Sequence, residues 1–145
     1  MKIRYLLFLS LMFSIAILPG VQSSAKADSV ILDENHSLHS LFHDFAKARV
    51  QIINKNFVHT PENLYVGPSE TLFVARYHQV DPATITIQVK KTNSGRTPYI
   101  GILSYRESVY ESNGGCNASV AQGPFAPVRH RDVTEIFRYV QNRWQ

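Results

Sequence analysis

The sequence contains a single cysteine in 145 residues, so no disulfide bond can form within one chain. No apolar run reaches the roughly 20 residues that a bilayer-spanning helix needs. Four common motifs are also missing: the Gly-rich phosphate loop, the serine nucleophile elbow, the zinc motif His-Glu-x-x-His and the redox motif Cys-x-x-Cys. These absences argue against the most easily recognised enzyme classes. They leave open an enzyme whose residues meet only in the fold.

The N-terminus has the features of a secretory signal peptide. Lys2 and Arg4 precede the apolar run Tyr5–Leu18, and the small-x-small sequence Ala25-Lys26-Ala27 follows. We expect cleavage after Ala27, which divides the chain into a leader of residues 1–27 and one domain of residues 28–145. The protein is therefore predicted to be exported, to the periplasm or to the extracellular medium, without a membrane span in its mature form.

The formal charge of +4 depends on this leader. Three of the fifteen Lys and Arg residues lie in it and none of the eleven acidic residues does, so twelve basic residues remain and the mature charge is +1. A nearly neutral domain without basic runs lacks the electrostatic features of a nucleic-acid-binding protein. We expect no nucleic-acid partner, and no motif points to a cofactor.

One amphipathic helix is predicted at the start of the mature domain, from Leu38 to Phe57. Its apolar residues follow the three-and-four spacing of a helix face. Ser37 is the expected N-cap, and Asn54–Asn56 mark the expected end. The apolar face comprises Leu38, Leu41, Phe42, Phe45, Ala48, Ile52 and Ile53.

Strand-like segments separated by turn signals fill the rest of the domain. Asp81-Pro82 and Asn113-Gly114-Gly115 are the turn signals that delimit several of them. The order predicts an α+β domain with one N-terminal helix packed on a curled antiparallel sheet of about four strands. The strand candidates are Glu70–Val80, Thr84–Val89, Tyr99–Glu111, Ala118–Gln122 and Val128–Val140.

This order of elements resembles the cystatin-like and nuclear-transport-factor-like group of folds. The resemblance covers Leu38 to Trp144 and implies a sheet that wraps the helix and can leave a pocket. No residue motif accompanies it: Gln88-Val89-Lys90 lacks both the spacing and the glycine of the inhibitory Gln-x-Val-x-Gly loop of cystatins. Protease inhibition is therefore not carried over, because a shared fold does not imply a shared activity.

Three histidines, His36, His39 and His43, fall within a narrow arc of the predicted helix. His39 and His43 are four residues apart and are the weak candidates for a metal site. They lie opposite the apolar face, which favours a solvated polar surface and no metal. Cys116 lies in a predicted turn without an activating neighbour, so its candidate role is an intermolecular disulfide.

Two carboxylates, Glu107 and Glu111, lie on the same face of one strand candidate. The distance between them is too long for the catalytic pair of a glycoside hydrolase, so cross-strand ion pairs are the expected role. The expected ion-pair partners are Arg76, Arg106 or Arg138. The many aromatic residues are expected to fill the core and its rim, or alternatively to line a binding surface.

These features favour a small non-catalytic binding or protein-interaction module of unknown ligand, with a homodimer through a sheet face as one arrangement. The alternative is a small pocket-type enzyme or ligand carrier on a nuclear-transport-factor-like fold. An enzyme should place an ionisable residue with a perturbed pKa at the floor of its pocket. A sealed core with an exposed aromatic patch would favour the interaction module.

Overall fold

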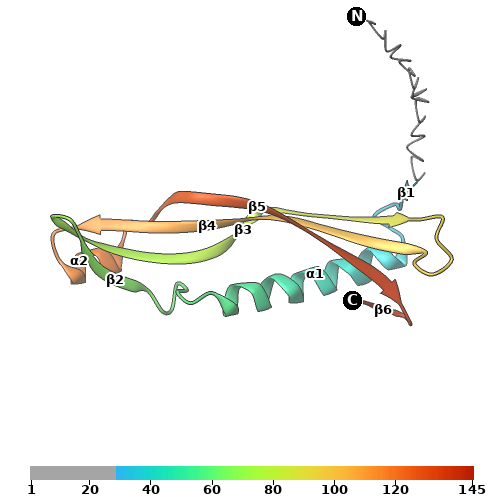
Figure 1. Cartoon of the computed structure of the whole chain (residues 1–145), viewed down its shortest axis with the longest axis horizontal. Coiled ribbons are helices and arrows are strands. Elements are labelled where there is room, and N and C mark those ends of the chain that lie inside the picture. The colour runs from blue at the N-terminus through green and yellow to red at the C-terminus, as the bar shows by residue number, and fades with distance from the viewer. Residues whose placement is uncertain (1–28) are drawn as a thin grey trace, which may run out of the picture.

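Two helices and six strands form an α+β unit in the computed structural model, which describes residues 29–145 (Figure 1). The predicted leader and the cleavage site after Ala27 lie outside the described residues. The predicted fold class is confirmed at this level, and the predicted arrangement of one helix on about four strands is roughly compatible with this structure. The elements are β1 (Val30–Ile31), α1 (Ser37–Asn56), β2 (Tyr65–Ser69), β3 (Leu72–Lys91), β4 (Tyr99–Gly114), α2 (Asn117–Gln122), β5 (Ala126–Val140) and β6 (Arg143–Trp144).

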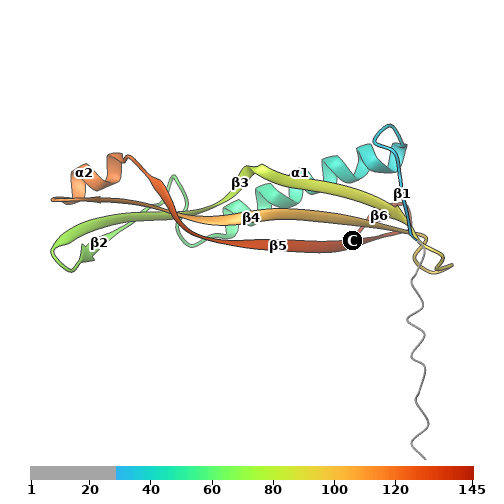
Figure 2. The ribbon, with the colours of Figure 1, turned by 90° about the horizontal axis from the view of Figure 1, so that it is seen from above.

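The sheet is antiparallel and is built on three long strands in the order β3-β4-β5 (Figure 2). Both β1 and β2 pair with the outer edge of β3, at its two ends. The short β6 returns along the end of β5 through a tight turn. The sheet is therefore long and narrow, with β3 and β5 at its two edges.

Helix α1 lies on one face of the sheet and buries a row of residues at four-residue spacing: Leu38, Phe42, Ala46 and Val50. Phe42 is fully buried, and its ring lies over Gly101 of β4. Side chains of three long strands complete this core, together with Trp144 from β6. They include Val80, Val89, Leu103, Tyr105, Ile87, Val133 and Phe137.

The structure confirms the predicted helix almost to its ends but corrects two details. The N-cap is His36, not Ser37: the Nδ1 atom of His36 accepts a hydrogen bond from the backbone N–H of Leu38 at 3.2 Å. The buried stripe is also narrower than expected, because Leu41 and Ile52 are about half exposed, at 51% and 50%. A single sheet face covers only one side of a helix, so a wide apolar stripe is only partly buried.

The predicted turn at Asp81-Pro82 is wrong, because β3 runs continuously from Leu72 to Lys91. Its register against β4 shifts between Asp81 and Thr86, so the extra residues bulge out of the strand. The bulge is closed by Thr84, whose hydroxyl donates to the Asp81 carbonyl and accepts from the backbone N–H of Arg106. A proline is compatible with such a bulge, since its missing N–H breaks no ladder bond there.

The strand predicted over Ala118–Gln122 is also wrong, because this segment forms helix α2. Both edges of β4 are already paired, with β3 and β5, so a hairpin after Gly114 would find no free strand edge. The segment instead turns and buries Val120 completely. A Cβ atom on Gly114 would lie 3.1 Å from the Val120 side chain, which shows how closely α2 packs on β4.

The two helices cover opposite faces of the sheet at opposite ends. On β4, α1 contacts Gly101 and α2 contacts Gly114, and these two residues are an odd number of positions apart. Side chains alternate between the two faces along a strand, so the two contacts lie on opposite faces. Beside α2, Tyr77 stacks on Tyr110 at 5.0 Å and meets Phe125 edge-on at 5.1 Å. The aromatic residues thus divide between the α1 core and this second cluster.

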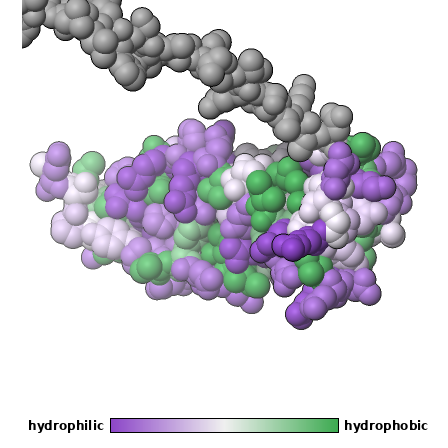
Figure 3. Space-filling model, turned by 45° about the vertical axis from the view of Figure 1, so that its right-hand side comes forward, coloured by the Kyte–Doolittle hydropathy of each residue, from purple (hydrophilic) through white to green (hydrophobic). Residues whose placement is uncertain are grey.

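Polar side chains cover much of the face shown in Figure 3, and apolar patches are scattered among them. The sheet face opposite α1 carries Arg106, paired with Asp132 at 2.8 Å, and Ser104, hydrogen bonded to Thr134 at 3.0 Å. None of the helices between residues 29 and 145 has the length and apolar character needed to cross a membrane.

Candidate functional site

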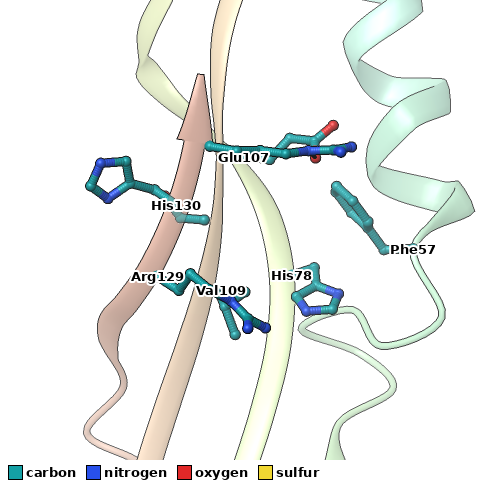
Figure 4. Close-up of a pocket in the computed structure, with 8 residues that line it drawn as sticks. Phe57, His78, Glu107, Val109, Arg129 and His130 are labelled. Atoms are coloured by element: carbon teal, nitrogen blue, oxygen red, sulfur yellow. Dashed lines mark hydrogen bonds and ion pairs between the residues drawn. The ribbon is translucent and has the colours of Figure 1, made fainter. Parts of the chain in front are cut away.

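A pocket of about 310 Å³ opens on the α1 face of the sheet, just beyond the C-terminal end of the helix (Figure 4). Phe57, the residue that ends α1, forms one wall. Three adjacent strands of the sheet supply the other walls. Side chains alternate between the two faces along each strand, so every second side chain points toward this face. These side chains are His78 from β3, Glu107 and Val109 from β4, and Arg129 and Arg131 from β5.

The strand register brings these residues together. His78 stands opposite Val109, which in turn stands opposite Arg129, so the three form one row across the sheet. In the next row Glu107 stands opposite Arg131. Figure 4 shows the Arg129 side chain extending toward Val109 and His78, whereas His130 points away from the group.

The two arginines of the pocket differ in their partners. Arg131 donates to the Glu107 carboxylate at 2.5 Å, and only 13% of the Glu107 side chain is exposed. Arg129 has no carboxylate partner among the described residues. The pocket thus contains one neutralised ion pair and one positive charge available to a ligand.

His78 forms the half-buried floor between Phe57 and Val109. Its ring meets that of Phe57 edge-on, with centroids 5.6 Å apart. Burial lowers the pKa of His78 below its ordinary value, and the nearby His59, Arg129 and Arg76 lower it further, against a smaller opposing effect of Glu107. The imidazole is therefore neutral at pH 7 and can donate or accept a hydrogen bond.

This arrangement suits a small anion with an apolar body. Arg129 can donate two parallel hydrogen bonds to a carboxylate or phosphate, while Phe57 and Val109 offer apolar contacts. The neutral His78 adds a hydrogen-bonding group without a second charge. Glu107 is held by Arg131, so it is not a free general acid or base.

The three histidines that include the weak metal candidates His39 and His43 lie far along α1 from this pocket. His36 caps the helix, His39 is half-buried, and His43 is exposed and 3.5 Å from the Asp44 carboxylate. Within residues 29–145, no group of three metal-ligating side chains is placed to hold an ion. The structure thus adds no third ligand to His39 and His43.

Cys116 lies in an exposed position at the start of α2. Hydrogen bonding with Ser119 lowers the pKa of its thiol. Its Sγ atom is 3.5 Å from the Ser119 hydroxyl, and no histidine contributes to the shift. The exposed thiol is compatible with the predicted intermolecular disulfide, which stays a prediction.

Both carboxylates form cross-strand ion pairs, as predicted, but only one of them has an expected partner. Glu111 pairs with Arg76 at 2.6 Å, as expected. Glu107 pairs with Arg131, which was not among its expected partners. The sequence showed Arg129-His130-Arg131 only as a short basic cluster beside a turn, because the pairing of β5 with β4 decides which of its side chains face Glu107.

Phe57 and His78 were not identified from the sequence as site residues. Phe57 was the last residue of the predicted helix, and His78 lay within a strand candidate. The sequence did show that His78 points to the same face of its strand as Arg76 and Val80. It did not show which strands are neighbours, so it could not show which side chains lie beside His78.

Comparison of this chain with protein-family models, with curated proteins and with solved structures finds no match. No family is therefore shown for it.

Proposed function

We propose that this protein is a small exported, non-catalytic binding module that holds a small organic anion in the pocket beyond α1. Arg129 carries this proposal: among the pocket's charged groups it alone has no partner of opposite sign within the described chain. The leader predicted over residues 1–27 supports the export. The ligand class follows from the chemistry around Arg129, namely a carboxylate or phosphate group joined to an apolar or aromatic body.

The electrostatics of the site favour binding over catalysis. A charge-assisted hydrogen bond contributes about 1.5–3 kcal/mol, more than a neutral one, and Arg129 can form two to one carboxylate. The other charges nearby, Glu107 and Arg131, already neutralise each other. A ligand with one negative charge would therefore complete the charge balance of the pocket.

The finer fold assignment also belongs to this proposal. One long helix precedes the long antiparallel strands and lies along one face of the sheet, as in the cystatin-like and nuclear-transport-factor-like folds. The pocket next to Phe57 lies just beyond the end of the helix.

The proposal is tested by NMR titration of residues 28–145 with benzoate, an anion with an aromatic body. We expect the signals of His78 and Val109 to shift with saturation. Arg129→Gln should weaken binding at least tenfold, since it removes the charge that pairs with the carboxylate. Arg138→Gln is the matched control, because Arg138 is exposed on the same strand, on the face opposite the pocket.

Benzyl alcohol, which keeps the ring but lacks the charge, should bind more weakly than benzoate. Equal affinities for the two, or equal effects of the two arginine substitutions, would contradict an anion site at Arg129.

A pocket-type enzyme or ligand carrier is the second candidate, and the half-buried position of His78 in the pocket lining is the observation that favours it. Burial also lowers the pKa of His78. A neutral imidazole at the floor of a pocket can serve as a general base. If turnover of an ester or a related anion is found, its rate should depend on pH through the His78 titration and vanish in His78→Gln. The binding module predicts no such turnover.

A further inference from the structure

The outer edge of β5 is open over most of its length. β6 pairs only with Tyr139 and Val140, and Gln145 exchanges two backbone hydrogen bonds with Arg138. From Ala126 to Phe137 no strand or loop of the described chain pairs with this edge. An edge strand of this kind presents a row of unpaired N–H and C=O groups.

The opposite edge of the sheet is closed. β2 pairs with Leu72–Arg76 and β1 with Lys90–Lys91 of β3. Between them the His59 carbonyl accepts from the N–H of His78 at 2.9 Å, and the Asn54 side chain accepts from that of Val80 at 2.8 Å. A bulge then interrupts the edge at Asp81–Thr86. One edge of the molecule is therefore protected at many points, and the other is not.

We propose that a second copy of this chain pairs antiparallel with β5, forming a two-fold dimer with one continuous sheet. Residues 126–128 are a poor template for pairing, because Pro127 has no N–H and the register shifts beside Tyr110. The edge of residues 138–140 is already paired with β6 and Gln145. The free segment is Arg129–Phe137, and its central residue, Val133, is placed on the two-fold axis.

The charges along β5 select this register. In the proposed dimer the two-fold axis is perpendicular to the sheet, and directly opposite residues point to the same face. Opposite residues therefore have the same parity, so one residue of β5 must stand opposite its own copy, at the axis. An axis at Arg131 or Asp132 would place like charges directly opposite each other. With Val133 on the axis, Arg131 stands opposite Glu135 of the partner subunit, and Asp132 stands opposite Thr134 of the partner subunit. The two-fold axis repeats each of these contacts, so each occurs two times in the dimer.

The proposed pairing closes the assembly. After β5 joins its copy, the two outermost strands are the protected β3 edges, so the interface predicts a closed dimer instead of a growing fibre. It uses neither Cys116 nor a sheet face, which distinguishes it from the two arrangements considered from the sequence. It also goes beyond the anion-binding proposal and does not depend on it.

Substitutions at Thr134 test the dimer and its register in residues 28–145 carrying Cys116→Ser. Thr134 is exposed on the face opposite α1 and would stand opposite Asp132 of the partner subunit. Thr134→Asp creates two like-charge contacts and should raise the dimer dissociation constant at least tenfold relative to Thr134→Lys. Sedimentation equilibrium measures both constants, and circular dichroism checks that each variant is folded.

Thr86→Asp is the matched control, because Thr86, Ser104 and Thr134 lie in one row across the same face, with Thr86 on the protected strand. This control should dimerise like the parent protein. In addition, Val133→Cys should form a disulfide with its own copy on oxidation, whereas Arg131→Cys should not, since the two copies of residue 131 would be about 13 Å apart.

A parent protein that stays monomeric at 200 μM would overturn the proposal. A dimer of equal strength in Thr134→Asp and Thr134→Lys would also overturn it, by placing the interface elsewhere. A monomer that binds an extended peptide along β5 would identify a different occupant for the same edge and would likewise overturn the dimer.

Discussion

Gly101 allows a close contact between helix α1 and the sheet. A Cβ atom at this position would lie 2.3 Å from the Phe42 ring, far inside van der Waals contact. The ring cannot move aside easily, because Trp144 packs against it at 4.6 Å and Phe137 at 6.0 Å. The glycine is therefore required for the approach of the helix, and its backbone conformation is not the reason.

Gly101→Ala should lower the free energy of unfolding by about 1–3 kcal/mol, the usual cost of overpacking a well-filled core. Gly95→Ala is the control: no atom lies within 4 Å of the added methyl group, so the change should stay within about 0.5 kcal/mol. Urea denaturation followed by Trp144 fluorescence measures both. Equal stabilities of the two variants would contradict the packing of Phe42 on Gly101.

His78 should make stability depend on pH near neutrality. Its folded-state pKa is lowered, first by burial, so the unfolded chain takes up a proton more readily than the folded one. The stabilising contribution is present above the unfolded pKa near 6.5 and is lost as the pH falls through the lowered folded value. His78→Gln should flatten the rise in unfolding free energy between pH 5 and pH 7.

The exposed His130, on the other face of the sheet, provides the control. His130→Gln removes an exposed histidine and so separates the effect of the pocket from the loss of a histidine in general. If both substitutions flatten the curve to the same extent, the effect does not come from the pocket.

At the scale of elements, α1 is tied to β5 as well as to the strands beneath it. Phe45 meets Phe137 edge-on at 4.8 Å, and Arg49 binds the Glu135 carboxylate through two hydrogen bonds of 2.8 and 2.9 Å. The hydrogen bond from Arg49 is the largest cause that lowers the pKa of Glu135. The carboxylate of this pair is less exposed than that of the Arg106–Asp132 pair on the opposite face, at 23% against 70%.

A double-mutant cycle with Arg49→Gln and Glu135→Gln should give a coupling free energy of about 1 kcal/mol, as for a two-point, partly screened ion pair. The same cycle on the exposed Arg106–Asp132 pair should give a smaller coupling. Because the pKa of Glu135 is lowered, this contribution is present above pH 4.5 and is lost as the pH falls through the folded value. A larger coupling for the exposed pair would contradict this assignment.

At the scale of the whole molecule, the two ends of the sheet have separate cores. The α1 core includes Phe42, Leu103 and Trp144, whereas Val120 of α2 is buried outside that cluster. The long strands β3 and β4 connect the two ends. Regions with few shared buried contacts can open independently.

Val120→Ala should therefore increase hydrogen exchange in residues 110–122 while leaving the protection of α1 nearly unchanged. Phe42→Leu is the comparison, and it should increase exchange across α1 and the strands beneath it, by lowering global stability by about 1 kcal/mol or more. Native-state hydrogen exchange by NMR distinguishes these patterns. Uniform loss of protection in Val120→Ala would mean that the two ends unfold as one unit.

Local patterns in the sequence determined the fold class and most elements of this protein. The apolar spacing from Leu38 onward predicted α1. Alternation over Thr84–Val89 predicted part of β3, and the aromatic and β-branched residues of Tyr99–Glu111 predicted most of β4. These signals are local, since a helix face or strand parity is visible within a few residues. The signal for Ala118–Gln122 was misleading, because whether a short segment can be a strand depends on a free neighbouring edge.

Tertiary structure alone decided the candidate site and the proposed interface. His78, Val109 and Arg129 come from three strands, and only the pairing register places them in one row. Likewise, the edge of β5 is open because β1, β2, Asn54 and His59 all lie on the other side of the sheet. Register and edge position are relations between distant segments, so the residues of one segment cannot specify them.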